Sequence, residues 1–388
     1  MRTAVTEMFG IDVPILAFSH CRDVVAAVTR AGGMGVLGAV AHSPEQLETD
    51  LAWIEAEIGD RPYGVDLIVP MSYAGSEAGG LSIEDVRALI SPQHRDFVAD
   101  ILRRYDVPEL PDEPGAAGER SSRDGPVGDA GAGMIFSAER ADPQLEIALA
   151  HRTALVVNAL GPPTQHMIER AKAEGRRIGA LAGAAHHAER HVRAGVDLIV
   201  AQGYEAGGHT GEIGSMVLIP EVVDAVGDTP VLGAGGIGRG RQMAAAMALG
   251  AAGVWCGSVW LTTDEAETHP VVKQKFLAAG SADTVRSRSR TGKPARQLRS
   301  AWTDEWDDPD TPAPLGMPMQ PVLVDGALRR IDRAAYREGS GAEKLANYFV
   351  GQIVGTMNQS KPAAQVVYEM IDEFIDATRS LGGQLEDG

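Results

Sequence analysis

The chain has 388 residues, of which 44% are hydrophobic and 23% are charged, and its formal net charge is −18 at pH 7. This acidic balance argues against a nucleic-acid or anionic-membrane partner, which would need a basic face, although backbone dipoles can still hold a small anion. The N-terminus lacks the apolar core of a signal peptide, and no run of about 18 apolar residues occurs, so we expect a cytoplasmic protein without a membrane span.

The first part of the chain alternates short apolar runs with amphipathic segments, the pattern of a repeating α/β fold. Two glycines end the first helical segment, and Ser43 with Pro44 supplies an N-cap and a first turn for the second. The predicted strands lie at residues 13–18, 34–38 and 63–69, and the predicted helices at residues 24–31 and 43–57.

Residues 71–132 interrupt this alternation. Helices are predicted at 83–90 and 93–105, whereas residues 108–133 are rich in Pro, Gly, Asp, Glu and Ser, which favours a surface loop. We interpret the segment as an insertion after the third strand, with a lid as one hypothesis.

From about residue 143 the alternation resumes. Strands are predicted at residues 154–158, 177–181, 197–201, 230–233 and 253–256, and helices at residues 143–151, 163–175, 184–194, 220–226 and 239–249. Eight strand–helix units predict an α/β protein with a closed (β/α)8 TIM barrel rather than an open sheet, since no GxGxxG motif opens the first unit. We expect the barrel to span residues 1–300. Residues 301–388 are expected to pack on it as an extension, with helices at 342–357 and 363–380.

The turns after the last three strands are the richest in glycine. They read Gln202-Gly-Tyr-Glu-Ala-Gly-Gly-His209-Thr-Gly211, Gly233-Ala-Gly-Gly-Ile-Gly238 and Cys256-Gly-Ser258. Glycines at the carboxyl ends of parallel strands let the backbone approach a ligand and leave N–H groups free for an anion. These turns therefore predict a ligand site, with His209 in the middle of the longest turn.

These motifs resemble those of the nitronate monooxygenases, formerly called 2-nitropropane dioxygenases. The histidine run at 202–211 carries the resemblance, and further matches follow at 230–237, 253–258 and 291–296. The resemblance covers roughly residues 8–70 and 140–300. It implies a TIM barrel that binds FMN across the carboxyl ends of its strands.

The resemblance also implies roles for individual residues. His209 would be the active-site base or polarising group beside the flavin. The phosphate would be held by Gly235, Gly236, Gly257 and Ser258. The ring and ribityl chain would be contacted by Gln202, Gly207, Gly208, Ala17, Phe18 and Asp66, and the cofactor set is completed by Ala234, Trp255 and Cys256. Ser19 and His20 would face the substrate.

Two departures from the family pattern bear on the substrate. The chain reads Ala17-Phe18-Ser19-His20 where the family commonly reads Ala-Pro-Met, and Asp66 stands where the family usually shows asparagine. Asp66 would therefore place a carboxylate near the flavin.

Other residues have less specific interpretations. His186, His187 and His191 lie on one predicted helix. The spacing of four residues between His187 and His191 could bind zinc, but a solvated helix face is the favoured interpretation. Cys21 and Cys256 form no CxxC pair, and Cys256 is expected to be a buried strand residue rather than a nucleophile. The basic run at 286–299 is interpreted as a surface loop, and one hypothesis has it meeting an anionic substrate.

Three functional hypotheses follow. The first is an FMN-dependent nitronate monooxygenase that oxidises alkyl nitronates with O2 to carbonyl compounds and nitrite. The second is an NAD(P)H-dependent enoyl-thioester or quinone reductase on the same barrel, and the third is a flavin-binding protein without turnover. The expected partners are a small-molecule substrate and O2, without metal, nucleic acid or membrane, and the sequence is compatible with a homo-oligomer.

Overall fold

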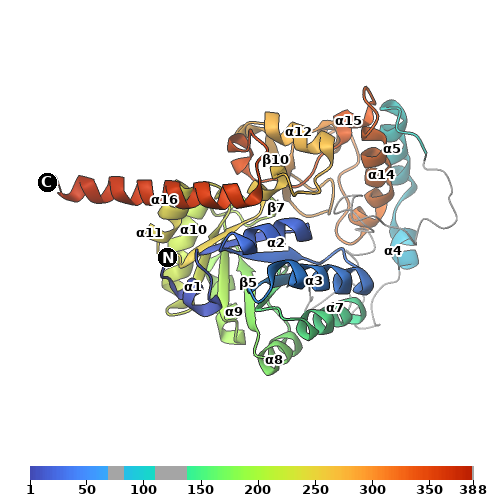
Figure 1. The fold of residues 1–388 in the computed structure, drawn as a ribbon. Coiled ribbons are helices and arrows are strands. Elements are labelled where there is room, and N and C mark those ends of the chain that lie inside the picture. The colour runs from blue at the N-terminus through green and yellow to red at the C-terminus, as the bar shows by residue number, and fades with distance from the viewer. Residues whose placement is uncertain (69–82, 110–137, 387–388) are drawn as a thin grey trace.

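A closed barrel of eight parallel strands forms the centre of the molecule (Figure 1). The computed structural model describes residues 1–68, 83–109 and 138–386. Every predicted barrel strand is present, so the TIM-barrel prediction is confirmed. In order around the barrel, the strands are β1 (Ile15–Ser19), β2 (Met34–Gly38), β3 (Gly64–Leu67), β4 (Leu155–Asn158), β5 (Arg177–Ala182), β6 (Leu198–Gln202), β8 (Val231–Ala234) and β9 (Gly253–Cys256).

Helices cover the outside of the barrel, and α1 (Ala4–Phe9) joins its interior cluster through Val5 and Phe9. The predicted cap of the helix after β2 is confirmed, because the Ser43 side chain accepts the backbone N–H of Gln46 at 3.2 Å. The outer helices are α2 (Arg22–Arg30), α3 (Pro44–Ile58), α7 (Ala138–Ala150), α8 (Gln165–Ala173), α9 (Ala185–Ala194), α10 (Ser215–Val226) and α11 (Gly240–Ala248).

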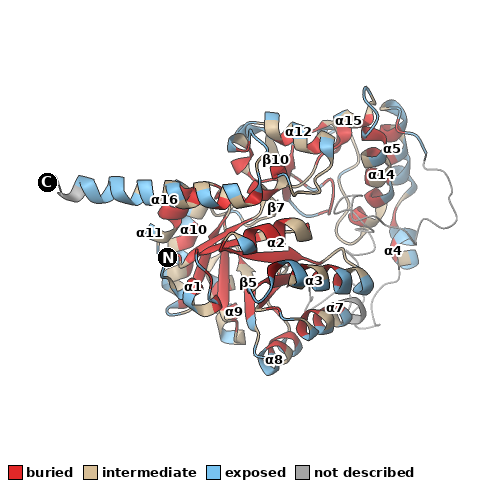
Figure 2. Cartoon of the chain, in the orientation of Figure 1, coloured by how far each residue is buried: buried red, intermediate tan, exposed pale blue. Residues whose placement is uncertain are grey.

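The strands are buried on both faces, which explains why their sequences are almost continuously apolar (Figure 2). Alternate side chains enter two different hydrophobic clusters. One cluster fills the barrel and includes Leu16, Met34, Val36, Leu155, Leu198 and Leu232. The other lies between strands and helices and includes Ile15, Leu37, Val65, Val156, Ile199 and Val254.

Helix α10 begins earlier than predicted. The sequence suggests Pro220 as the first residue, but the helix begins at Ser215 and contains Pro220. Its first N–H is accepted by the Glu205 carboxylate at 2.9 Å. This cap comes from the loop after β6, so a local sequence pattern does not reveal it.

A third hydrophobic cluster lies outside the barrel, and we call the elements that share it the cap. Val98, Ile101 and Leu102 from the insertion pack there with residues of the tail, such as Trp302 and Leu328. The cap consists of α5 (Pro92–Arg104), α12 (Pro270–Ala278), α13 (Ala301–Asp307), α14 (Met319–Ala335), α15 (Ala342–Leu345) and η4 (Gln352–Thr356). The insertion and the tail therefore share one core.

The insertion is described only in part. Helix α4 (Ile83–Leu89) and α5 agree with the predicted helices, and both contact α14 (Figure 1). Most of the predicted surface loop at 108–133 lies outside the described residues, as does the remainder of the hypothetical lid.

The predicted helix at 342–357 is wrong. Helix α15 ends at Leu345, and the chain then extends until η4. The reason is a close backbone contact, because a Cβ on Gly351 would lie 2.6 Å from the Glu205 carbonyl oxygen. The last predicted helix is confirmed and is longer, as α16 (Ala363–Glu386), whose end extends beyond the body of the molecule (Figure 1).

A small antiparallel sheet lies beside the barrel and was not predicted. It joins β10 (Thr284–Ser287), β11 (Ala295–Leu298) and β7 (Gly208–His209). The two remaining short helices are η2 (Ser258–Thr262) and η3 (Ser281–Asp283).

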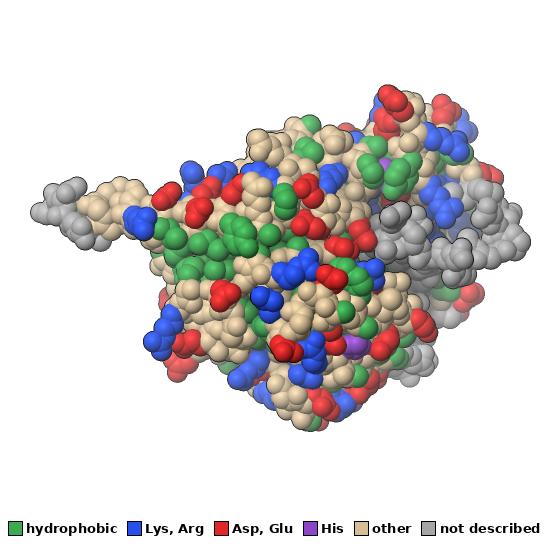
Figure 3. Space-filling model, viewed as in Figure 1, with side chains coloured by type: hydrophobic (Ala, Val, Ile, Leu, Met, Phe, Trp, Pro, Cys, Tyr) green, Lys and Arg blue, Asp and Glu red, His purple; other side chains and the backbone are tan. Residues whose placement is uncertain are grey.

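Basic and acidic side chains are interspersed over the face seen in Figure 3, so this face has no extended basic area. Within the described ranges, none of the helices combines the length and apolar character needed to cross a bilayer.

Candidate functional site

The carboxyl ends of β1, β2 and β3 place several predicted site residues on the inner face of the barrel. Phe18 is in register with Val36, and Gly38 is in register with Asp66. Neighbouring residues in register on parallel strands point to the same side, and Val36 belongs to the interior cluster. Phe18, Gly38 and Asp66 therefore face the mouth of the barrel.

The turn after β8 has the geometry of an anion cradle. Gly235 and Gly236 have φ values of +93° and +69°, which side chains rarely adopt. A Cβ on Gly235 would also lie 3.0 Å from the Gly203 carbonyl oxygen. Within the described chain, no group accepts a hydrogen bond from the backbone N–H of Gly236. Two glycines thus leave an unpaired donor at the carboxyl end of the strand.

Ser258 completes this side of the mouth. Its Oγ accepts the backbone N–H of Gly351 at 2.8 Å, so the hydroxyl hydrogen remains available to donate. Gly257 packs close to Phe18, because a Cβ on Gly257 would lie 3.6 Å from the Phe18 ring. The tail residue Gly351 thus fixes a predicted phosphate-binding hydroxyl.

Glu205 and Ser215 hold the glycine turns in place. The Ser215 Oγ lies 3.0 Å from Glu205 Oε2 and 2.8 Å from the Gly235 carbonyl oxygen. Glu205 is the acidic residue of the histidine motif, and it also caps α10. These contacts tie the turn after β6 to the turn after β8.

His209 lies on β7 and is partly exposed. Its Nδ1 is 3.3 Å from the carbonyl oxygen of Pro294, which can only accept. The ring hydrogen therefore belongs on Nδ1, and Nε2 keeps a lone pair. Burial lowers the pKa of His209 from its ordinary value of 6.5, and the nearby charge of Lys293 lowers it further, while the Pro294 carbonyl raises it. The neutral imidazole can act as a base.

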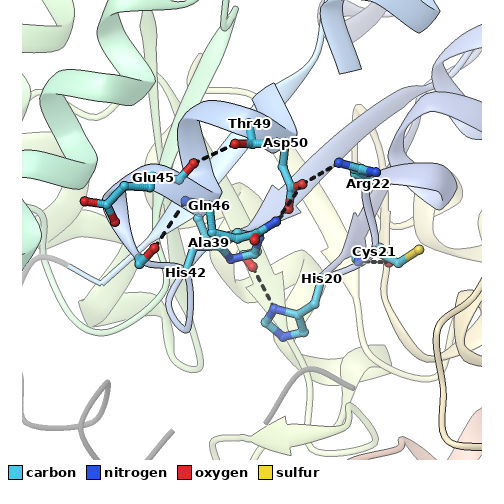
Figure 4. Close-up of polar contacts among 12 residues, drawn as sticks. His20, Cys21, Arg22, Ala39, His42, Glu45, Gln46, Thr49 and Asp50 are labelled. Carbon is cyan, nitrogen blue, oxygen red and sulfur yellow. Dashed lines mark hydrogen bonds and ion pairs between the residues drawn. The ribbon is translucent and has the colours of Figure 1, made fainter. Parts of the chain in front are cut away.

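His20 is fixed by a similar backbone contact. Its Nδ1 lies 2.7 Å from the Gly38 carbonyl oxygen, as Figure 4 shows, and burial lowers the pKa of its ring. A Cβ on Gly38 would lie 2.7 Å from this Nδ1 and 2.8 Å from the Phe18 ring. The absence of a side chain at Gly38 is therefore what makes room for both rings.

A polar network behind His20 supports its loop (Figure 4). Asp50 of α3 is buried and accepts hydrogen bonds from Arg22 at 2.8 Å and from Gln46 at 2.9 Å. His42 Nε2 lies 3.1 Å from its other carboxylate oxygen. This network joins the loops that follow β1 and β2.

Asp66 is also buried, with 4% of its surface exposed, but its environment is different. Its Oδ1 has no hydrogen-bond partner among the described residues. Burial raises the pKa of the Asp66 carboxyl well above its ordinary value. Burial without a hydrogen-bond partner therefore disfavours the expected carboxylate and favours the protonated acid.

The remaining predicted residues take several positions. The Gln202 amide makes no hydrogen bond with another described side chain or backbone group, whereas the Ser19 Oγ accepts the N–H of Cys21 at 3.1 Å. Ala234 and Trp255 belong to the interior cluster, and the Trp255 ring stacks near Phe18 with centroids 6.0 Å apart. Ala17 and Cys256 belong to the outer cluster, so only their backbone can face the mouth.

The two predicted glycines of the histidine motif differ in their surroundings. A Cβ on Gly207 would lie 2.9 Å from the backbone of Val350 and Gly351, whereas one on Gly208 would meet nothing within 4 Å. Gly207 therefore permits the tail to pack against the loop. Gly208 has a φ of +74° and borders open space.

The basic segment does not form a surface loop, which corrects that interpretation. Arg290 and Arg296 are 6% and 3% exposed. Arg290 donates to the Asn347 side chain at 3.0 Å, and Arg296 donates to the Tyr204 carbonyl at 3.1 Å and stacks on its ring. Their carbonyl and aromatic partners come from distant parts of the chain, which composition cannot show.

The two cysteine thiols and the histidine helix have structural surroundings. Burial raises the pKa of Cys21 and of Cys256 to about 12, so both thiols stay protonated. His191 is buried and its Nε2 lies 3.1 Å from the Leu181 carbonyl oxygen, which departs from the solvated helix face expected there.

Sequence reasoning missed three supports of the site. They are Ser215, the Pro294 carbonyl that orients His209, and the tail backbone at Val350–Gly351. Only Pro294 had a signal, because it lies within the matched run at 291–296.

Comparisons with known proteins identify the family and the fold. A family model described as nitronate monooxygenase matches residues 121–373. The chain is 58% identical over 386 residues to "Putative monooxygenase Rv1533" of Mycobacterium tuberculosis, and all of both chains is covered. It is 29% identical to "Probable nitronate monooxygenase" of Staphylococcus saprophyticus, over 85% of this chain and 87% of that protein.

Solved structures are similar over almost the whole chain. The nitroalkane oxidase of Streptomyces ansochromogenes is 26% identical with a TM-score of 0.77, covering 97% of this chain and 100% of that one. FabK from Thermotoga maritima is 25% identical with a TM-score of 0.70, covering 99% of each chain.

Proposed function

This chain belongs to the nitronate monooxygenase family and is an oxidoreductase, and we propose that it uses FMN to oxidise alkyl nitronates with O2 to carbonyl compounds and nitrite. The observation that carries the proposal is His209, whose Nδ1 is held by the Pro294 carbonyl so that its Nε2 is free to act as a base. The glycine turn after β8 adds a cradle for an anion. The relatives named for nitronate or nitroalkane substrates support the choice of substrate.

The residues at the mouth fit FMN. The unpaired N–H of Gly236 and the free hydroxyl hydrogen of Ser258 are suitable donors to a phosphate. Phe18 and Trp255 offer apolar surface for a flat ring, and the unpaired amide of Gln202 can bond its polar edge.

Bound FMN would supply the electron transfer from the nitronate to O2. His209 would take the proton from the carbon that bears the nitro group when the neutral nitro form binds, which yields the nitronate, because its Nε2 lone pair is free while Nδ1 is held by Pro294. His20 would orient the substrate through its own free Nε2.

The experiment mixes the FMN-loaded protein without oxygen with propionate 3-nitronate, and separately with NADH or NADPH, while flavin absorbance is recorded. We expect the nitronate alone to bleach the flavin. We also expect His209→Asn to lower turnover of the neutral nitroalkane by about 10²–10⁴-fold while FMN stays bound. The exposed His186 of α9 provides a matched control, because His186→Asn should leave turnover unchanged.

The pH profile gives a second readout. Because the pKa of His209 is lowered, the base is neutral at pH 7, and turnover should fall only as the pH drops below the ordinary value of 6.5. Bleaching by the nicotinamide alone would replace this proposal with the reductase. Unchanged turnover in His209→Asn would remove His209 from the mechanism.

A further inference from the structure

Asp66 is a buried polar group that the contacts of the protein leave unsatisfied. Its side chain is almost fully buried, and its Oδ1 has no partner among the described residues. Buried polar groups are normally hydrogen-bonded, because an unpaired group loses its contacts with water and gains none in return. An unpaired carboxyl at the mouth of a ligand-binding barrel therefore indicates a group that is completed by a ligand.

The carboxyl faces the same side of the sheet as Phe18 and His20. Gly38 is in register with Asp66, and a Cβ added to Gly38 would contact the rings of both Phe18 and His20. On its other side, Asp66 is in register with Val157 of the interior cluster. Because Gly38 has no side chain, nothing at this position lies between the Asp66 carboxyl and the space beside the Phe18 and His20 rings.

No cation among the described residues compensates a charge on Asp66. The neighbouring strands β2 and β4 contain no titratable side chain. On the inner face, the titratable side chain beside these rings in the described part of the chain is His20, and burial lowers the pKa of its ring. Asp50 of α3 and Glu146 of α7 lie on the outer side of the strands, where they pair with Arg22 and Arg170.

These surroundings make the carboxyl a hydrogen-bond donor rather than an anion. Burial without a cation favours the protonated form and raises the pKa of Asp66. A protonated carboxyl has one O–H to donate, whereas a carboxylate can only accept. The amide implied at this position by the family pattern would donate at every pH, but an aspartic acid donates only while it keeps its proton.

We propose that Asp66 binds FMN as a neutral carboxylic acid that donates its hydrogen to an acceptor on the flavin ring, so that ionisation of this acid at higher pH weakens FMN binding. The proposal rests on FMN as the cofactor of the proposed function. It adds a pH-dependent contact that a family member with asparagine would lack.

The test is the dissociation constant of FMN, measured by fluorescence titration of the apoprotein in steps from about pH 5 to pH 9. The variants are the unaltered protein, Asp66→Asn and Asp60→Asn. Asp60 is a matched control because its carboxyl is fully exposed at the end of α3. Riboflavin serves as a second probe, since it has the same ring and no phosphate to titrate.

We expect the dissociation constant of the unaltered protein to rise at least tenfold relative to that of Asp66→Asn as the acid ionises, for both probes. Asp60→Asn should follow the unaltered protein. The absorption spectrum of bound flavin should change over the same pH range in these two proteins but not in Asp66→Asn.

Two results would overturn the proposal, and they differ in what else they affect. If FMN binds to all three proteins with the same pH dependence, Asp66 does not donate to the flavin, and the proposed function stands. If neither FMN nor riboflavin binds to any of them, both this inference and the FMN-dependent function are wrong.

Discussion

Two regions of the molecule each bury one aspartate. Asp50 lies in the contact between α2 and α3, and Asp66 lies on the inner face of the barrel mouth. Asp50 is 5% exposed and Asp66 is 4% exposed, so their burial is almost the same. Burial raises the pKa of Asp50 as well, but hydrogen bonds from His42 and Gln46 and the charge of Arg22 bring it below its ordinary value. No described cation does this for Asp66, and its pKa is raised.

The difference teaches that burial alone does not decide the state of a carboxyl. Partners decide it, because a charge removed from water is stable only where donors and a counter-ion replace the water. Asp50 is therefore a structural anion that joins two loops. Asp66 lacks such partners, so burial favours its protonated form, and a ligand can supply the missing partner.

The largest effect should come from removing the anion in the paired region. Asp50→Ala leaves Arg22, His42 and Gln46 without their shared acceptor, and we expect a loss of about 3–5 kcal/mol in the free energy of unfolding. Urea unfolding monitored by circular dichroism measures it. A loss below about 1 kcal/mol would mean that the network contributes no more than a surface ion pair.

The second effect separates the two aspartates by pH. Above the ordinary Asp value of 3.8, the unfolded chain loses the Asp66 proton while the folded protein keeps it. Unfolding then releases a proton, so stability falls by about 1.4 kcal/mol per pH unit until the folded carboxyl also ionises. The Tm of Asp66→Asn, compared with that of the unaltered apoprotein at pH 4 to 7, should show a gap that widens in favour of the variant. A gap independent of pH would contradict a neutral Asp66.

A smaller effect should come from filling the space beside Asp66. In Gly38→Ala, the new Cβ would contact the rings of His20 and Phe18, and we expect a loss of about 1–3 kcal/mol. Gly326 of α14 is the matched control, because a Cβ there meets nothing within 4 Å. Gly326→Ala should raise the free energy of unfolding by about 0.5–1 kcal/mol. Equal effects of the two changes would show that the space at Gly38 is not constrained.

The smallest effect should come from an exposed ion pair between α2 and α3. Glu57 pairs with Arg30 at 2.7 Å, with 44% and 45% of their side chains exposed. Glu57→Gln should cost less than about 1 kcal/mol, and about 1 M salt should abolish the difference. If Glu57→Gln lowered the free energy of unfolding as much as Asp50→Ala does, paired charges on the surface would contribute as much to stability as those in the interior.

The sequence by itself determined the barrel and the place of its mouth. Apolar runs of strand length and glycine stops are local features, and they predicted all eight strands because each strand is buried on both faces. The glycine turns at 202–211 and 233–238 were also expected from the sequence, and positive φ values at Gly208, Gly235 and Gly236 favour glycine there; a ligand at these turns stays a prediction.

Only the tertiary structure decided the chemical state of the site. The start of α10 depends on Glu205, the hydrogen on His209 depends on Pro294, and the segment before η4 is extended because Gly351 packs on the loop after β6. Asp50 and Asp66 are the same residue in the sequence, and their partners alone make one an anion and the other an acid. These partners are brought together by the closed barrel and its cap, so local sequence patterns do not contain them.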